Sequence, residues 1–366
     1  MSTLVFLVLA ASRPPAPKVI GPRVSEKPLV TYRFRSVHRA RFRCALDARR
    51  LKVCRSPYRV RLTVGAHVLR VRAVDPRGRL SPAAMVRIRI LEPRAPEVRV
   101  GVSPLDAITV GNALWTENYG DGTASIVDAA TRHVTSVPVG GVPGGIGYGA
   151  GSVWIGDLGN GALTRLTPGG AVIARIALGG QSAGIAVGAG IAYVADYTGG
   201  LWRIDTATNQ VLGRTALPGR PEAVAVGFGR VWVTNELGTV TTLDPVTGAV
   251  LGSPILVGAD ADGVSISQDG VWAVALYGRT LVRVDPASLQ VVTRVRTPGQ
   301  ASGVLVSGGS VWVSNYDSAT VSRFDIAAGK FVKSYRVGKE PRGLAEAGGA
   351  VWVANQASNS VSRITP

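Results

Sequence analysis

The chain has 366 residues, of which 46 are glycine, and 46% of its residues are hydrophobic. This length leaves room for two domains. The net charge of +18 lies in residues 1–99, which hold 23 Lys and Arg against 5 Asp and Glu, whereas residues 100–366 hold 18 of each. Residues 100–366 therefore have no excess of positive charge that would attract a polyanion, which argues against nucleic-acid binding there.

Residues 1–17 are predicted to be a signal segment and a proline-rich linker. Leu4 to Ala11 is an apolar run, and Arg13 to Pro17 contains three prolines. The run resembles the apolar part of a secretion signal, although no positive charge precedes it. An apolar tail, or a start codon placed too late, is the alternative. We expect an exported protein with no transmembrane span in this chain, because eight apolar residues are too few to cross a bilayer.

Residues 18–92 are predicted to form a small basic β-sandwich. Apolar and basic residues alternate strictly, as in Arg33-Phe34-Arg35 and Arg87-Ile88-Arg89. A period of two places the apolar residues on one face of a strand and the arginines on the other. Several such strands predict two packed antiparallel sheets with an arginine-rich surface.

This module contains both cysteines of the chain, Cys44 and Cys54. By themselves, two cysteines ten residues apart are compatible with a disulfide in an oxidising compartment. Two buried free thiols are the alternative. The motifs Phe42-x-Cys44-x-Leu-Asp47, Cys54-x-Ser-Pro57-Tyr58 and Gly65-x-His67-x-Leu-x-Val-x-Ala-Val-Asp75 resemble the immunoglobulin-like module of exported bacterial proteins. That resemblance implies an adhesive or spacer role and a Cys44–Cys54 disulfide.

The arginines of residues 18–92 have two interpretations. Long basic side chains are ordinary on exposed strands, where they prevent edge-to-edge aggregation. However, 18 net positive charges in a quarter of the chain exceed what solubility requires. We therefore expect this module to contact an anionic cell-envelope polymer. Nucleic acid ranks lower as a partner, because no aromatic residues alternate with the arginines to stack on bases.

From about Gly101 onward the chain repeats one unit of about 40 residues. Tryptophans mark the unit, with Tyr193 at one of the seven positions, and the steps are 39 or 40 residues: Trp115, Trp154, Tyr193, Trp232, Trp272, Trp312 and Trp352. Each unit holds four short runs rich in β-branched residues and separated by Gly, Pro, Asn and Asp, which predict strands. Four strands per repeat are typical of one blade of a β-propeller.

The last repeat ends after its third strand, so one strand is missing. The segment at Val98 to Val100 has the spacing of a fourth strand, and we expect it to lie beside Ser360–Ile364. This pairing would close the ring and leave no open sheet end. The fold class is therefore predicted to be all-β, with a seven-bladed propeller over residues 97–366 whose last blade is closed by three strands plus one.

A binding site is predicted at the mouth of the central channel. The loops that join one blade to the next carry a different residue in each repeat, and a ligand site requires such asymmetry: Glu222, Asp262, Ser302 and Arg342. Asn118, Asn235, Asn315 and Asn355 occur three residues after the tryptophans and are included in the predicted site, with Tyr119, Tyr197 and Tyr316. Asparagine also ends strands for a structural reason, because its side chain bonds turn backbone.

The repeats, with Val231-Trp-Val-Thr-Asn235 as an example, resemble YVTN-type propellers and are similar to the virginiamycin B lyase (streptogramin lyase) family. The lyase resemblance implies a magnesium ion and a catalytic histidine from a blade-to-blade loop. Here no such loop contains histidine, so no catalytic residue and no cofactor are predicted. If a divalent cation such as magnesium binds, Glu222 and Asp262 are its expected ligands, because hard cations prefer oxygen.

The expected function is that of an exported, monomeric, non-catalytic binding protein. Its propeller face would bind a peptide, a glycan or a protein, and its basic module would contact the cell envelope. The alternatives are a metal-dependent lyase-like enzyme and a sensor ectodomain.

Overall fold

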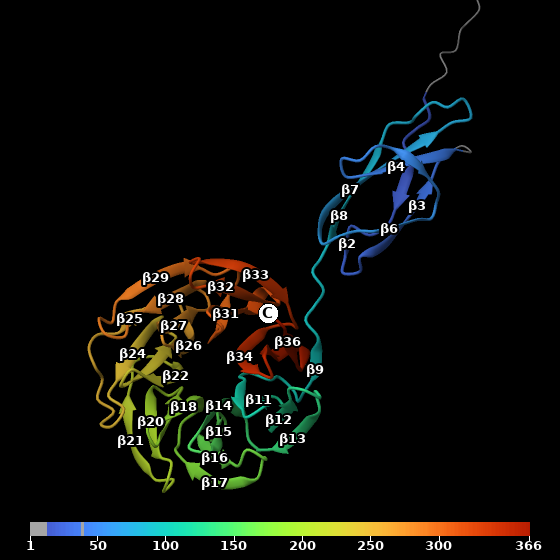
Figure 1. The fold of residues 1–366 in the computed structure, drawn as a ribbon. Coiled ribbons are helices and arrows are strands. Elements are labelled where there is room, and N and C mark those ends of the chain that lie inside the picture. The colour runs from blue at the N-terminus through green and yellow to red at the C-terminus, as the bar shows by residue number, and fades with distance from the viewer. Residues whose placement is uncertain (1–12, 38–39) are drawn as a thin grey trace, which may run out of the picture. The chain divides into compact units, whose positions relative to one another are not determined.

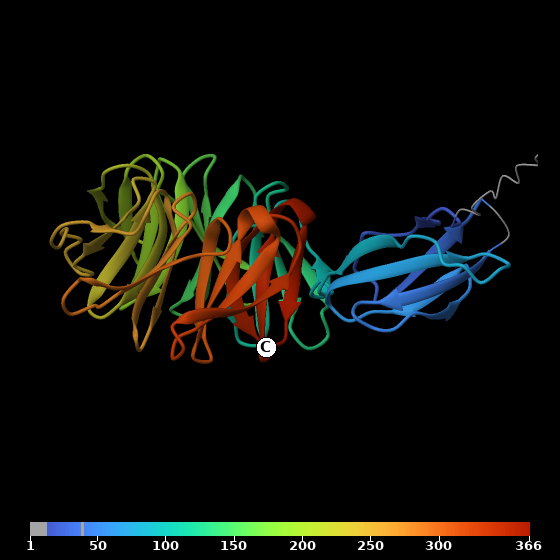
Figure 2. The same ribbon diagram turned by 90° about the horizontal axis from the view of Figure 1, so that it is seen from above.

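The computed structural model describes residues 13–37 and 40–366. The predicted signal run lies outside the described residues. The chain forms two compact units, one that ends at Pro93 and one that spans Arg94–Pro366. Figures 1 and 2 show that both units are built from strands. In the described part of the chain, the only helical segments are two 3₁₀ turns, η1 (Tyr316–Ser318) and η2 (Gln356–Ser358).

The first unit contains a three-stranded sheet, in the order β1-β3-β6, and a five-stranded sheet, in the order β2-β8-β7-β4-β5. Its strands are β1 (Lys18–Ile20), β2 (Val24–Ser25), β3 (Leu29–Arg35), β4 (Arg41–Leu46), β5 (Lys52–Cys54), β6 (Tyr58–Arg61), β7 (Gly65–Val74) and β8 (Ala84–Ile90).

Both sheets of the first unit contribute to one apolar core. Tyr32 and Phe34 on β3 pack with Leu69 and Val71 on β7. On β3 the burial alternates residue by residue, with Tyr32 and Phe34 inside and Arg33 and Arg35 exposed, as the period of two predicts. Cys44 and Cys54 form a disulfide between β4 and β5, which confirms the bridge that the resemblance implied.

In the second unit, the described residues form seven four-stranded antiparallel sheets. Figure 1 shows them arranged around a central axis, as in a β-propeller. The sheets are β10 (Ile108–Val110), β11 (Ala113–Asn118), β12 (Thr123–Asp128), β13 (Val134–Pro138); β14 (Pro143–Gly149), β15 (Ser152–Asp157), β16 (Ala162–Leu166), β17 (Val172–Ala177); β18 (Ser182–Gly188), β19 (Ile191–Asp196), β20 (Gly200–Asp205), β21 (Val211–Ala216); β22 (Pro221–Gly227), β23 (Arg230–Asn235), β24 (Thr239–Leu243), β25 (Ile255–Leu256); β26 (Ala261–Ser267), β27 (Gly270–Ala275), β28 (Thr280–Val284), β29 (Val291–Arg296); β30 (Ala301–Ser307), β31 (Ser310–Asn315), β32 (Thr320–Asp325), β33 (Lys330–Arg336); and β34 (Pro341–Ala347), β35 (Ala350–Asn355), β36 (Ser360–Ile364), with β9 (Glu97–Arg99).

The last of these sheets confirms the predicted closure. Its fourth strand, β9, pairs with β36 and places Val98 opposite Val361. The strand covers residues 97–99, one residue earlier than predicted. Ser360 donates a side-chain hydrogen bond of 2.6 Å to Glu97, which joins the two segments again. Residues from both ends of the propeller sequence therefore share one sheet.

The six tryptophans at the repeat positions fill the space between adjacent sheets. All six, and Tyr193, are at most 2% exposed. Trp232 on β23 packs with Val271 and Ala273 on β27 of the next sheet, and Trp352 on β35 packs with Leu114 on β11 across the closure. Replacing one buried tryptophan by alanine costs about 3–5 kcal/mol in a typical core. The six tryptophans of the repeat positions are therefore core residues. No helix among the described residues is long and apolar enough to cross a membrane.

The closing strand yields a stability prediction. Val98 packs against the core cluster that contains Trp352, whereas Val292 on another fourth strand, β29, is 51% exposed. Val98→Asp should lower the free energy of unfolding by roughly 2 kcal/mol or more, because it places an unpaired charge in a partly buried apolar site. Val292→Asp should change it by less than about 0.5 kcal/mol. Equal effects of both variants in urea unfolding would contradict this role of β9.

Candidate functional site

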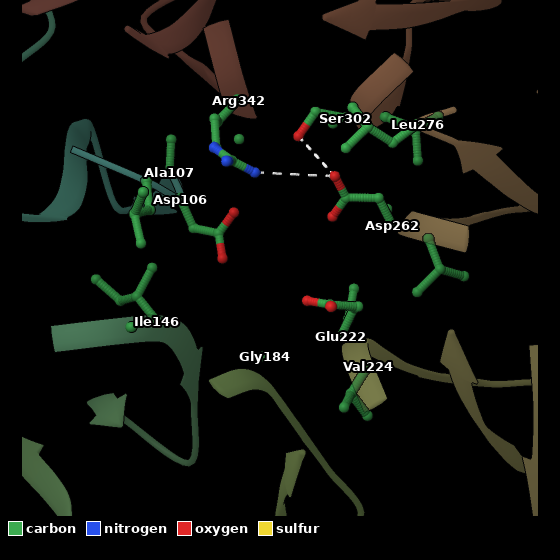
Figure 3. A pocket seen from close by; sticks show the side chains of 18 of the residues that line it. Asp106, Ala107, Ile146, Gly184, Glu222, Val224, Asp262, Leu276, Ser302 and Arg342 are labelled. Carbon is green, nitrogen blue, oxygen red and sulfur yellow. Dashed lines mark hydrogen bonds and ion pairs between the residues drawn. The ribbon is translucent and has the colours of Figure 1, made fainter. Parts of the chain in front are cut away.

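The propeller has a cavity of about 510 Å³ at its centre. Its walls come from the beginnings of the innermost strands, including β22, β26 and β34, and from the turns that follow second strands, at Tyr119, Tyr197 and Tyr277. Figure 3 shows carboxylates from different sheets directed toward a shared space, with Arg342 beside them. The cavity is therefore formed by residues that are far apart in the sequence.

Close approach of the innermost strands explains a column of small residues in the repeats. Six repeats have Gly or Ala nine residues before the marker position: Gly145, Gly184, Ala223, Gly263, Gly303 and Gly343. A Cβ atom on Gly184 would lie 2.2 Å from the carbonyl oxygen of Glu222, and one on Gly303 would lie 2.3 Å from that of Arg342. The small residues allow the backbones of neighbouring sheets to touch at this point. Most of the residues directly before them, such as Glu222 before Ala223, line the cavity.

The four predicted loop residues all line this cavity. Asp262 accepts a hydrogen bond of 2.9 Å from the Ser302 hydroxyl, and its Oδ2 lies 3.9 Å from Nη1 of Arg342. Arg342 is itself held in place, because its Nε donates to Gln356 at 2.7 Å and its guanidinium stacks 4.8 Å from the Tyr316 ring. These contacts fix one half of the site.

Glu222 organises the other half. It accepts hydrogen bonds from the Tyr197 hydroxyl at 2.6 Å and from Nε of Arg220 at 2.8 Å. Arg220 also stacks 4.8 Å from the Tyr197 ring. The Glu222 side chain is only 10% exposed, so its position is well determined by packing.

The remaining predicted residues separate into two groups. Tyr119 and Tyr197 line the cavity, whereas Tyr316 does not line it and instead supports Arg342. The structure does not bring the four asparagines to the cavity. They are at most 2% exposed and bond to hydroxyl groups of their own sheets: Asn118 to Ser125, Asn235 to Thr239, Asn315 to Ser322 and Asn355 to Ser362. The structural explanation of the asparagines fits this placement.

Four charged residues of the site were not predicted: Asp106, Asp260 and Arg220, which line the cavity, and Glu117, which lies behind Asp106. Asp106 occupies the column that holds Gly or Ala in the other six repeats, and this exception was visible in the sequence. Glu117 is fully buried, and its Oε1 accepts a hydrogen bond of 3.0 Å from the Asp106 amide. In other sheets the hydroxyls of Thr234 and Ser314 accept the equivalent bond.

Burial controls the ionisation of the carboxyl groups. Desolvation raises the pKa of Asp106, Glu222 and Asp260 above the ordinary values, even though the arginines act in the opposite direction. It raises the pKa of Asp262 to about 7, with a further contribution from the charge of Glu222 and against the effect of Arg342. Desolvation, with repulsion from Asp106, also raises the pKa of Glu117. The site is therefore an accumulation of negative charge that burial opposes.

The charged side chains that line the cavity are carboxylates and arginines. No histidine, cysteine or lysine is among the residues that line it. Within the described ranges, no three His, Cys, Asp or Glu residues are grouped closely enough to hold a metal ion. The arrangement combines fixed carboxylates, two stacked arginines and apolar walls, which suits recognition of a ligand group.

The comparisons with known proteins support the fold. The family profile described as outer membrane protein assembly factor BamB matches residues 159–253. A chain of Kuenenia stuttgartiensis hydrazine synthase is similar in structure, with a TM-score of 0.65 and 16% identity over 72% of this chain and 96% of that chain. A chain of a mitotic checkpoint complex also has a TM-score of 0.65, with 10% identity over 75% of this chain and 90% of that chain. No curated protein sequence matches this chain. At these identities the likeness shows the β-propeller fold alone.

The raised pKa of Asp262 predicts a pH-dependent stability. Because the folded protein retains this proton up to about pH 7 and the unfolded chain releases it near pH 4, the free energy of unfolding should fall across that window. Asp262→Asn removes this contribution. In urea unfolding, the free energy of unfolding of the variant minus that of the original chain should increase by on the order of 2 kcal/mol between pH 4 and pH 8. Asp269→Asn, in the exposed turn that follows β26, should show no such gain. A pH-independent difference for Asp262→Asn would contradict the shift.

Proposed function

We propose that this protein is an exported, non-catalytic binding protein whose seven-bladed propeller takes part of a peptide, protein or glycan ligand into the central cavity. The observation that carries this proposal is the convergence of Glu222, Asp262, Ser302 and Arg342 on one cavity. These residues break the repeat pattern, and Tyr197, Ser302 and Tyr316, which contact Glu222, Asp262 and Arg342, come from neighbouring sheets. A repeated scaffold needs such asymmetry for recognition, not for folding.

A binding role agrees with the comparison and with the chemistry of the walls. The matched family is described as an assembly factor of the outer membrane, which supports a role in protein interaction and a location in the envelope. Its profile covers 95 residues of the propeller, so the proposal rests mainly on the cavity. A lyase-like enzyme or a sensor ectodomain remains the alternative, and no observation specifically favours either. Catalysis by elimination needs a general acid or base; no histidine lines the cavity, so a carboxyl group such as Asp262, whose pKa is raised to about 7, would have to fill that role.

The basic, Ig-like module (residues 18–92) is proposed to contact an anionic cell-envelope polymer. Six arginines on one face of the five-stranded sheet support this. They follow a diagonal across three neighbouring strands: Arg41 and Arg43 on β4, Arg70 and Arg72 on β7, and Arg87 and Arg89 on β8. Arg43 and Arg72 are direct cross-strand partners. Like charges at such positions destabilise a sheet, so an external anion offers a reason for their presence.

Ligand arrays test the role of the cavity. Labelled full-length chain should bind a limited set of members on arrays of peptides and of glycans. The double variant Glu222→Ala plus Asp262→Ala should lose at least about tenfold in affinity for those members, because two carboxylates of the site are removed. Asp269→Asn should retain binding. Binding that is unchanged by the double variant, or no specific binding on either array, would refute the proposed use of this cavity.

Binding to immobilised polyphosphate tests the module separately. We expect affinity to fall steeply with salt. Arg43→Ser plus Arg72→Ser should weaken binding and reduce its salt dependence, whereas the charge-matched control Arg296→Ser plus Lys330→Ser, on exposed positions of the propeller, should not. Equal losses in both double variants would show that net charge alone, and not this face, attracts the polymer.

A further inference from the structure

We infer that the group received by the cavity is a primary ammonium on an aliphatic stem, as in the lysine side chain of a peptide or protein. This inference rests on the proposed function and specifies the ligand of the same site. The inference excludes a neutral glycan as the group that lies beside the carboxylates of the cavity.

The first argument is the charge balance of the lining. Four carboxylates face two guanidinium groups: Asp106, Glu222, Asp260 and Asp262 against Arg220 and Arg342. Both arginines are already engaged, Arg220 by Glu222 and the Tyr197 ring, and Arg342 by Gln356 and the Tyr316 ring. Fully ionised, the lining retains an excess of two negative charges. An added cation would relieve this excess in a site where water screens charge poorly.

The second argument is that carboxylate oxygens remain available. The structure records no hydrogen bond from any described residue to the Asp106 side chain, and Figure 3 shows this carboxylate directed into the cavity between Arg342 and Glu222. Directly behind it, Glu117 is fully buried, and its Oε2 has no hydrogen-bond partner in the described part of the chain. A buried carboxyl oxygen without a partner is costly and rare. A proton donor that enters beside Asp106 would therefore meet carboxylate oxygens of Asp106 that no donor of the described chain uses.

The third argument concerns which cation fits. A bare metal ion is disfavoured, because the described residues contain no group of three ligands that could hold one. Apolar side chains of Ile146, Leu158, Val224 and Leu276 also line the cavity and suit an aliphatic stem. An ammonium has three donors that point in different directions, which matches carboxylates that come from separate sheets. Tyr119 and Tyr277, which are 44% and 67% exposed, lie at the same cavity and can flank a cationic side chain.

The test uses the full-length chain and Nα-acetyl-L-lysine methylamide as the probe. Titration calorimetry or NMR should detect saturable binding of this probe. Its Nε-acetylated form, which keeps the stem but removes the charge and two of the donors, should bind at least about tenfold more weakly. Asp106→Asn, which keeps the size of the side chain, should weaken binding of the amine by about tenfold, whereas Asp269→Asn should change it less than about twofold.

The outcomes separate this inference from the proposed function. Equal binding of the two lysine compounds, or binding of the amine that Asp106→Asn does not change, overturns the inference. If array glycans without charge bind in a manner that requires Glu222 and Asp262 while the amine does not bind, the proposed function stands and the inference is wrong. If no member of either array binds and the amine does not bind, both are wrong. Magnesium chloride that binds at Asp106 in preference to the amine also overturns the inference. The comparison of probes on the original chain remains decisive if Asp106→Asn fails to fold.

Discussion

The pairing of β9 with β36 is the constraint on which the propeller depends. It joins residues 97–99 to the last strand of the chain and completes the seventh sheet. Closure also brings Trp352 against Leu114, so the last and first sheets pack as any other neighbouring pair does. An open ring would expose two sheet faces and a strand edge, both of which favour aggregation. The repeats therefore form one closed ring when the two ends of the propeller sequence pair.

Closure also forms the cavity that is the candidate site. When the sheets surround an axis, their innermost strands approach each other so closely that most repeats carry glycine at the point of contact. The residues beside these glycines then face the cavity. The blade core and the cavity thus impose opposite demands on the repeat. The core requires a large aromatic residue in each unit, tryptophan in six and Tyr193 in the seventh, whereas the residues at the cavity differ among the units.

The buried carboxyl groups of the site reduce the stability of the folded protein when they are ionised. Asp106, Glu117, Glu222 and Asp262 all have raised pKa values because burial disfavours their charged forms. None of these residues is needed to form a blade, since other repeats place Gly, Ala, Thr or Ser at the same positions. Proteins often accept such destabilising groups where binding or chemistry requires them. The arginines of the first unit also reduce stability, because Arg43 and Arg72 carry like charges at directly paired positions of the sheet.

The sequence by itself determined the repeat, the strands, the closing segment and the four loop residues, because a regular period allows one repeat to be aligned with the next. The same alignment drew attention to Asn118 and its equivalents, which the tertiary structure places inside the sheets, where Ser125 and similar hydroxyls bond them. Only the tertiary structure decided that Asp106, Arg220 and Asp260 share the cavity and that Tyr316 supports Arg342. Alignment identifies which positions are equivalent, but the direction and partners of a side chain depend on the neighbouring sheet, and that neighbour is fixed only when the ring closes.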